Sequence, residues 1–271
     1  MQIYSFCPRW GQAHIPWNDF ASMVKSSGYD GVETDIPADE KERELILNAL
    51  SRHGLQLIAQ HWETVEPDFN QHLSAYKERL EIMALANPVL INSQTGKDYY
   101  SFEQNALLIE AASELTAASG IPVYHETHRG KFSFAAHITK EYLQRIPALV
   151  LTMDLSHWIA VAETLLQDQE DAVALAASRS GHFHARVGHT QGAQVNDPRA
   201  PEWEESLHVH IDCWDKIYKA NKEAGKPFLT FTAEFGPAPY MPLLPFTRQP
   251  VASQWEINEY MSGMLKSRYK V

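Results

Sequence analysis

The chain has 271 residues, of which 44% are hydrophobic and 21% are charged, proportions typical of a folded globular protein rather than a disordered or fibrous one. Its formal net charge of -11 disfavours nucleic acid as a partner, because an acidic protein repels phosphate backbones. The N-terminus has no basic region followed by a long apolar run, and no stretch reaches the roughly 18 apolar residues of a membrane helix, so we expect neither export nor membrane insertion.

Short apolar runs alternate along the chain with longer amphipathic stretches, about eight times. We expect strands at residues 2–6, 31–36, 55–61, 88–92, 121–126, 149–154, 182–186 and 228–234. We expect helices at residues 17–27, 38–53, 68–86, 102–119, 135–145, 159–179, 204–224 and 254–267. This alternation predicts parallel strands joined by helices, and the length suits the about 250 residues of an α/β protein of the (β/α)8 TIM barrel class.

Two longer segments interrupt the alternation. Residues 187–203 are rich in glycine and proline and are typical of an extended loop, and residues 236–250 carry five prolines. Neither segment is typical of an interdomain linker, so we expect residues 1–271 to form one domain, with residues 236–250 covering the barrel mouth. Cys7 and Cys213 show neither a disulfide framework nor metal-binding spacing, so a reducing cytoplasm is the expected location.

Four strands of the second half end in a side chain that can bind a metal ion. These side chains are Glu126, Asp154, His184 and Glu234. The carboxyl ends of barrel strands converge on one mouth, and alternation along each strand turns all four inward, so we expect them to surround one ion. Three carboxylates and one imidazole favour Mn²⁺ or Mg²⁺ and tolerate Co²⁺ or Zn²⁺. A single acid at a strand end is usually a helix cap or a surface charge, and it is the recurrence that indicates a site.

Further side chains near the predicted strand ends are candidates for binding a substrate. They are Trp10, Glu33, His61, His128, Arg129, His157 and His189. Structural roles compete with this interpretation: His157 can pack at a helix start, Arg129 can form a loop salt bridge, and aromatic rings near a barrel rim can belong to the core. His182, two residues before His184, is expected to be a hydrogen-bonded interior histidine.

Several segments, in this order along the chain, resemble the xylose-isomerase-like barrel superfamily. They are Gly28-Tyr29-Asp30-Gly31-Val32-Glu33, Glu126, the pair Asp154 and His157, the pair His182 and His184, and Thr232-Ala233-Glu234-Phe235-Gly236. The resemblance spans essentially the whole chain and points to the sugar isomerase and epimerase group, with tagatose/psicose epimerases, hydroxypyruvate isomerases and inosose dehydratases. It implies that Glu126, Asp154, His184 and Glu234 bind the metal. It also implies that Glu126 and Glu234 move the proton and that His157 binds substrate.

The implied activity is a metal-dependent isomerase or epimerase that acts through an enediolate-like intermediate on a small-molecule sugar, polyol or keto acid. The loop after His184 usually carries an arginine in the epimerases. Residues 186–191 here read Arg-Val-Gly-His-Thr-Gln in a longer loop, and residues 125–130 also depart from the usual sequence. The substrate-binding pattern is therefore altered, and no particular sugar is indicated. A homodimer and a homotetramer both stay open.

Three other functions are compatible with parts of the sequence. The same proton removal serves a dehydratase or lyase acting on a keto-polyol. An apurinic endonuclease also has an Asp-x-x-His pair, but it needs three zinc ions and histidines at early strand ends; His61 is present, whereas residues 92–94 contain none and residues 208–210 are expected to be helical. A non-catalytic sugar-binding barrel is the third alternative.

Overall fold

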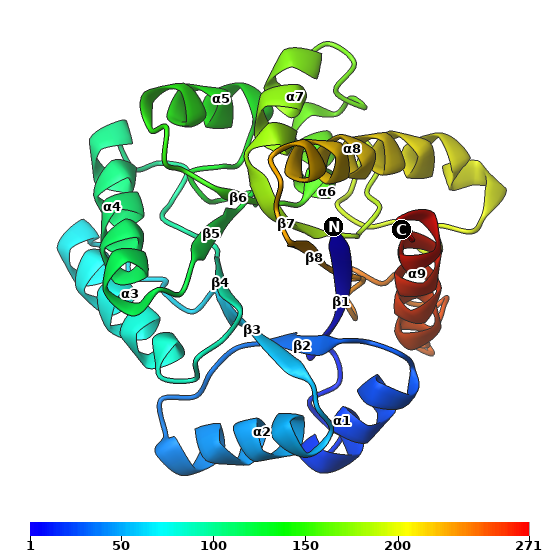
Figure 1. The fold of residues 1–271 in the computed structure, drawn as a ribbon. Coiled ribbons are helices and arrows are strands. Elements are labelled where there is room, and N and C mark those ends of the chain that lie inside the picture. The colour runs from blue at the N-terminus through cyan, green and yellow to red at the C-terminus, as the bar shows by residue number, and fades with distance from the viewer. Residues whose placement is uncertain (271) are drawn as a thin grey trace.

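Eight parallel strands close into a barrel in a computed structural model that describes residues 1–270 (Figure 1). Each strand pairs with the next in chain order, and β8 pairs with β1 to close the sheet. The strands are β1 (Gln2–Pro8), β2 (Gly31–Thr34), β3 (Gln56–His61), β4 (Leu90–Ser93), β5 (Val123–Glu126), β6 (Leu151–Met153), β7 (Ser180–His184) and β8 (Phe228–Thr232). The closed barrel confirms the predicted (β/α)8 class. The expected domain of residues 1–271 includes position 271, which lies outside the described residues.

Helices surround the barrel on its outer side (Figure 1). They are α1 (Trp17–Ser26), α2 (Glu40–Arg52), α3 (Phe69–Ala84), α4 (Phe102–Ser119), α5 (Ala136–Arg145), α6 (Leu155–Ala162), α7 (Glu170–Ser178), α8 (Glu204–Glu223) and α9 (Gln254–Arg268), with a short 3₁₀ turn at Pro201–Trp203. Across residues 1–270, none of these helices has the length and apolar character of a membrane span. Cys7 and Cys213 are buried and unpaired.

The prediction of one helix over residues 159–179 is wrong, because two helices occupy this part of the chain. Helix α6 begins at Leu155, directly after β6, and Asp154 caps it by accepting a hydrogen bond from the Ser156 amide. It ends where Glu163 adopts a left-handed conformation with φ of 54°, and Leu166 does the same with φ of 64°. Helix α7 then starts afresh. Neither break involves glycine or proline, which explains why the residue pattern did not indicate it.

Alternation along the strands sends one set of side chains outward to the helices and the other into the barrel. The outward set packs in two large hydrophobic clusters, one mainly against α1 to α4 and one mainly against α5 to α9. Inside the barrel, Phe6, Ile58 and Leu90 form a small apolar cluster. A Cβ atom at Gly31 would lie 2.3 Å from the Phe6 ring, so glycine leaves the space that this ring fills. Two residues further along β3 and β4, the inward side chains are Gln60 and Asn92. The mouth of the barrel is therefore polar.

Candidate active site

The carboxyl ends of β5, β6, β7 and β8 bring together the four side chains expected to bind a metal. Glu126 and His184 are the last residues of β5 and β7, Asp154 follows β6 directly, and Glu234 lies two residues after β8. Each offers one donor atom, these atoms all lie within 4.8 Å of one another, and all four residues are buried. The expected convergence is present in the fold, and metal binding by these residues stays a prediction.

The donor atoms of this cluster lie close to one another. His184 Nδ1 lies 2.7 Å from Glu234 Oε2 and 3.6 Å from Glu126 Oε1. His184 Nδ1 and Glu126 Oε1 are nevertheless both buried without a well-formed hydrogen bond. Because buried polar atoms normally have a partner, converging unpaired lone pairs fit a bound cation. A donor set of three carboxylates and one imidazole fits Mn²⁺ or Mg²⁺ best.

The charges of the cluster shift its pKa values in opposite directions. Burial, reinforced by the neighbouring carboxylates and partly offset by His184, raises the pKa of Glu126 to about 8. Burial would also raise the pKa of Glu234, but the positive charges of His184 and Arg186 hold it below its usual value. Burial would lower the pKa of His184, yet the carboxylates of Glu234 and Glu33 raise it well above its usual value. The positive charge of Arg186, and that of His184 when its ring is protonated, offset the negative charge of the carboxylates.

Arg186 is a site residue that the sequence analysis did not single out. Its side chain is buried, and its Nη2 donates to Asp154 Oδ2. The same nitrogen lies 2.8 Å from His157 Nε2 and 3.6 Å from Glu234 Oε2. A signal was present in the sequence, because Arg186 stands two residues after His184 and alternation turns both side chains the same way.

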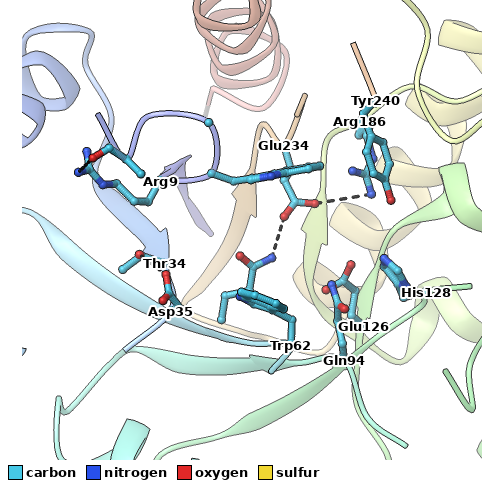
Figure 2. A pocket seen from close by; sticks show the side chains of 14 residues that line it. Arg9, Thr34, Asp35, Trp62, Gln94, Glu126, His128, Arg186, Glu234 and Tyr240 are labelled. Carbon is cyan, nitrogen blue, oxygen red and sulfur yellow. Dashed lines mark hydrogen bonds and ion pairs between the residues drawn. The ribbon is translucent and has the colours of Figure 1, made fainter. Parts of the chain in front are cut away.

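A cavity of about 400 Å³ opens beside the cluster, a volume within the range of small-molecule sites (Figure 2). Glu126, His128, Arg186 and Tyr240 lie toward one end of the view, and Arg9, Thr34 and Asp35 lie toward the other. The indole rings of Trp10 and Trp62 also line the cavity. Figure 2 shows the Glu234 carboxylate between the two ends, where Gln60 Nε2 donates to its Oε1 at 2.8 Å. Both ends of the cavity carry charged side chains, and aromatic rings form part of its walls.

Two of the histidines expected to contact substrate lie together beside this cavity. His128 lines it, and its ring centroid lies 3.9 Å from that of His157. His157 stands inside α6 rather than on a loop, does not line the cavity, and reaches the site through its Nε2 contact with Arg186. Burial lowers the pKa of His128 to about 3 and that of His157 well below its usual value. Both rings are therefore neutral at physiological pH.

His61 faces away from the cavity, and Gln60 takes the inward place on β3. The His61 ring packs against Tyr76 of α3, with centroids 5.1 Å apart, and its Nδ1 lies 3.2 Å from Ser93 Oγ. The expected role of His61 in binding substrate is therefore not supported by its position. Because neighbouring residues of a strand point to opposite faces, one residue decides which side chain reaches the site.

Three further expected substrate contacts do not line the cavity. Glu33 is buried beneath the carboxylate cluster, where its Oε1 lies 3.2 Å from His184 Nε2. His189 lies on the loop after β7 and packs against Trp203, with ring centroids 4.8 Å apart. Arg129 is exposed, and its guanidinium lies 5.2 Å from the centre of the Tyr240 ring at the cavity wall. Of the expected contacts, His128 and Trp10 alone line this cavity.

Similarity to known proteins extends over most of the chain. A family model described as xylose isomerase-like TIM barrel matches residues 21–234, and a search of curated proteins gave no match. Similar solved structures include a probable 3-DHS dehydratase from Bacillus anthracis, with 16% identity, a TM-score of 0.60 and coverage of 99% of this chain and 100% of that one. A 3-keto-D-glucoside 4-epimerase from E. coli has 13% identity, a TM-score of 0.60 and coverage of 98% and 100%. A D-tagatose 3-epimerase-like protein has 10% identity, a TM-score of 0.57 and coverage of 100% of both chains.

These three likenesses, at such low identity, show a shared fold. The match to the family model covers far more than half of the sequence and confirms the resemblance drawn from its motifs. The chain therefore belongs to the xylose isomerase-like TIM barrel family.

Proposed function

We propose that the protein is a divalent-metal-dependent isomerase or epimerase that moves a proton at a carbon next to the carbonyl group of a sugar or sugar derivative. The observation that carries this proposal is the convergence of Glu126, Asp154, His184 and Glu234 beside the cavity. A bound Mn²⁺ or Mg²⁺ supplies Lewis-acid polarisation of the substrate oxygens, which acidifies the adjacent C–H bond. The similarity to structures of sugar epimerases supports this class of substrate.

In this proposal the two glutamates move the proton. Asn92 Nδ2 donates to Glu126 Oε2 at 3.1 Å, and the other oxygen of Glu126 has no partner. Gln60 Nε2 likewise donates a hydrogen bond to Glu234 Oε1. Each carboxylate is thus fixed through one oxygen beside the cavity that both residues line. One glutamate, ionised, removes a proton from the substrate carbon, and the other, protonated, donates its own proton to the intermediate; exchange with solvent then restores both protonation states.

Arg186 supplies a fixed positive charge at the same end of the cavity. Its guanidinium is held by Asp154 and lies 4.9 Å from the centre of the Tyr240 ring. A donor that is already oriented stabilises the negative charge that develops on a substrate oxygen when the neighbouring proton leaves. Trp10 and Trp62 form apolar walls that exclude water from the substrate.

The test combines metal analysis of the purified protein with a panel of ketoses, inososes and keto acids in deuterated solvent. Nuclear magnetic resonance follows solvent deuterium into the carbon next to the carbonyl. We expect one bound ion per chain and enzyme-dependent exchange with at least one substrate. Glu126→Gln and Glu234→Gln should each slow this exchange by about 10² to 10⁴-fold, because each removes a proton-transferring group.

Glu202→Gln is the matched control, because Glu202 is exposed on the short turn before α8. It should leave exchange unchanged. Exchange that survives in both site variants would rule out the two-glutamate mechanism. Three ions per chain would instead favour a nuclease, although the outward position of His61 weakens that alternative. Binding of sugars without exchange would favour a non-catalytic barrel.

A dehydratase acting on a keto-polyol is the second candidate. The observation that favours it is His128, which lies with Glu126 at the cavity and uses its Nδ1 to donate to the Arg129 carbonyl at 2.7 Å. Its Nε2 is then free to accept a hydrogen bond from a substrate hydroxyl next to the acid that Glu126 provides. Loss of water from the panel substrates, seen by mass spectrometry, would identify elimination rather than isomerisation.

A further inference from the structure

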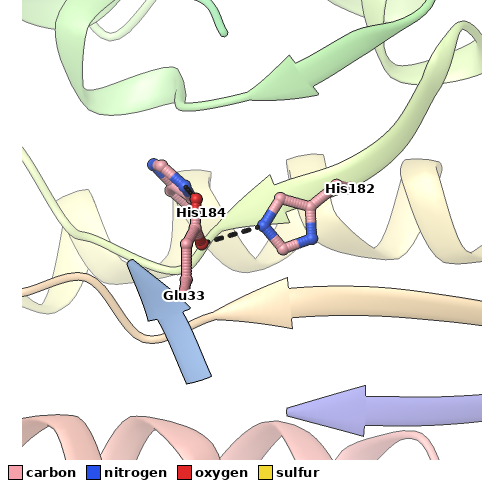
Figure 3. Close-up of side chains that lie close together, drawn as sticks. All are labelled: Glu33, His182 and His184. Carbon is pink, nitrogen blue, oxygen red and sulfur yellow. Dashed lines mark hydrogen bonds and ion pairs between the residues drawn. The ribbon is translucent and has the colours of Figure 1, made fainter. Parts of the chain in front are cut away.

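Glu33 occupies a buried position directly beneath the proposed metal ligands, although the sequence suggested a contact with substrate. It lies in β2, and 1% of its surface is exposed. Figure 3 shows its carboxylate between the rings of His182 and His184. Oε1 lies 3.2 Å from His184 Nε2 and Oε2 lies 3.4 Å from His182 Nε2. Two further donors complete its surroundings: Asn92 Nδ2 at 2.9 Å from Oε1, and Thr232 Oγ1 on Oε2.

This environment fixes the protonation of the imidazole. A carboxylate with four donors around it accepts hydrogen bonds and donates none, so His184 Nε2 carries a proton toward Glu33. The other ring nitrogen, Nδ1, then presents its lone pair to Glu126, Asp154 and Glu234 when the ring is neutral. A histidine that binds a metal through one nitrogen needs the other nitrogen held in this way.

Asn92 extends the same support to a second proposed ligand. Its amide nitrogen donates to Glu33 Oε1 and also to Glu126 Oε2, at 2.9 Å and 3.1 Å. These two contacts use both of its N–H groups. The orientation of Glu126 is therefore connected to Glu33 through a single buried amide.

We propose that Glu33 is a positioning residue, which orients His184 directly and Glu126 through Asn92 so that both face the metal ion. The proposal rests on the metal site of the proposed function. A buried carboxylate that served packing alone could be replaced by an apolar side chain at little cost, whereas this one has each oxygen shared between two donors from different strands.

Glu33→Gln tests the proposal, with Glu202→Gln as the control. Glu202→Gln makes the same chemical change at an exposed carboxylate on the short turn before α8. Isothermal titration with Mn²⁺ measures the dissociation constant of each protein, and thermal unfolding without metal checks the fold. We expect Glu33→Gln to weaken Mn²⁺ binding by about 10 to 100-fold, and Glu202→Gln to leave it within about threefold.

A second readout needs no variant. Long-range ¹H–¹⁵N spectra of the Zn²⁺-loaded wild-type protein should show His184 protonated on Nε2 and metal-bound through Nδ1. The opposite assignment would overturn the role of Glu33, as would unchanged Mn²⁺ affinity in Glu33→Gln or an equal loss in Glu202→Gln. A wild-type protein that binds no Mn²⁺ would overturn the proposed metal site itself, so the two failures are distinguishable.

Discussion

Arg186 shows how a single side chain sets the charge of the site. Its Nε donates to Ser156 Oγ at 3.3 Å while Nη2 donates to Asp154, so two N–H groups along one edge of the guanidinium are used at once. A lysine ammonium provides the charge without this planar fork. We expect Arg186→Lys to lower kcat by about 10²-fold and to change KM less, because the charge develops as the reaction proceeds.

Steady-state kinetics on the substrate identified by the exchange panel would measure this effect. Arg186→Met serves as the comparison, because it leaves Asp154 without its partner and should lower the free energy of unfolding by about 3 to 5 kcal/mol. A KM that rises while kcat stays constant in Arg186→Lys would show that Arg186 stabilises the bound substrate and the transition state equally.

The sequence identifies a residue that points into the barrel when the alternation of side chains along its strand is clear. The four proposed metal ligands each follow an apolar run, and the structure brings all four together. On β3 the neighbours Gln60 and His61 are both polar, so the pattern does not decide which one points inward; Gln60 contacts Glu234, and His61 packs against Tyr76. A shift of one residue exchanges the two faces of a strand.

At the scale of elements, the sequence predicts the strands better than the breaks between helices. The strands and most helices follow apolar periodicity, whereas the backbone turn at Glu163 depends on a left-handed conformation that this residue type rarely indicates. The early start of α6 has a direct consequence for the site, because it places His157 inside a helix against Arg186.

The segment after β8 depends on close contact between Gly236 and Trp10. A Cβ atom at Gly236 would lie 2.2 Å from the Trp10 ring, so Gly236→Ala must displace this wall of the cavity. We expect the free energy of unfolding to fall by about 1 to 3 kcal/mol, measured in urea, and KM to rise.

Gly263→Ala is the matched control, because Gly263 lies inside α9 and nothing would meet its Cβ within 4 Å. There the extra methyl group favours the helix, and stability should rise by about 0.5 to 1 kcal/mol. Equal stability of Gly236→Ala and the wild-type protein would contradict the predicted steric conflict.

At the scale of the whole molecule, two buried histidines outside the site make stability depend on pH. Burial lowers the pKa of His125 to about 3 and that of His210 to about 4. His210 uses both nitrogens as a neutral ring, since Nδ1 donates to the Ser206 carbonyl and Nε2 accepts from the Gly188 amide. The unfolded chain takes up these protons near pH 6.5, whereas the folded chain does not, so stability falls as the pH decreases below 6.5.

We expect each of these histidines to contribute a loss of about 2 kcal/mol between pH 6.5 and pH 5. Urea unfolding across this range measures the slope, and His210→Gln should make it shallower by removing one titrating group. A slope that is the same in His210→Gln would show that His210 is not the source of the acid sensitivity.

The contacts of Glu33 also bear on the order in which the protein folds and binds a metal ion. Glu33 comes from the second strand, and Thr232, which donates to it, ends the last one, while Glu234 follows two residues later. During synthesis Glu126, Asp154 and His184 emerge from the ribosome long before Glu234, so a nascent chain carries an incomplete set of donors. The complete set forms only when β8 pairs with β7 and brings Glu234 beside His184. An ion that needs all four donors cannot guide the early steps of folding, and its capture would follow the addition of the last strand.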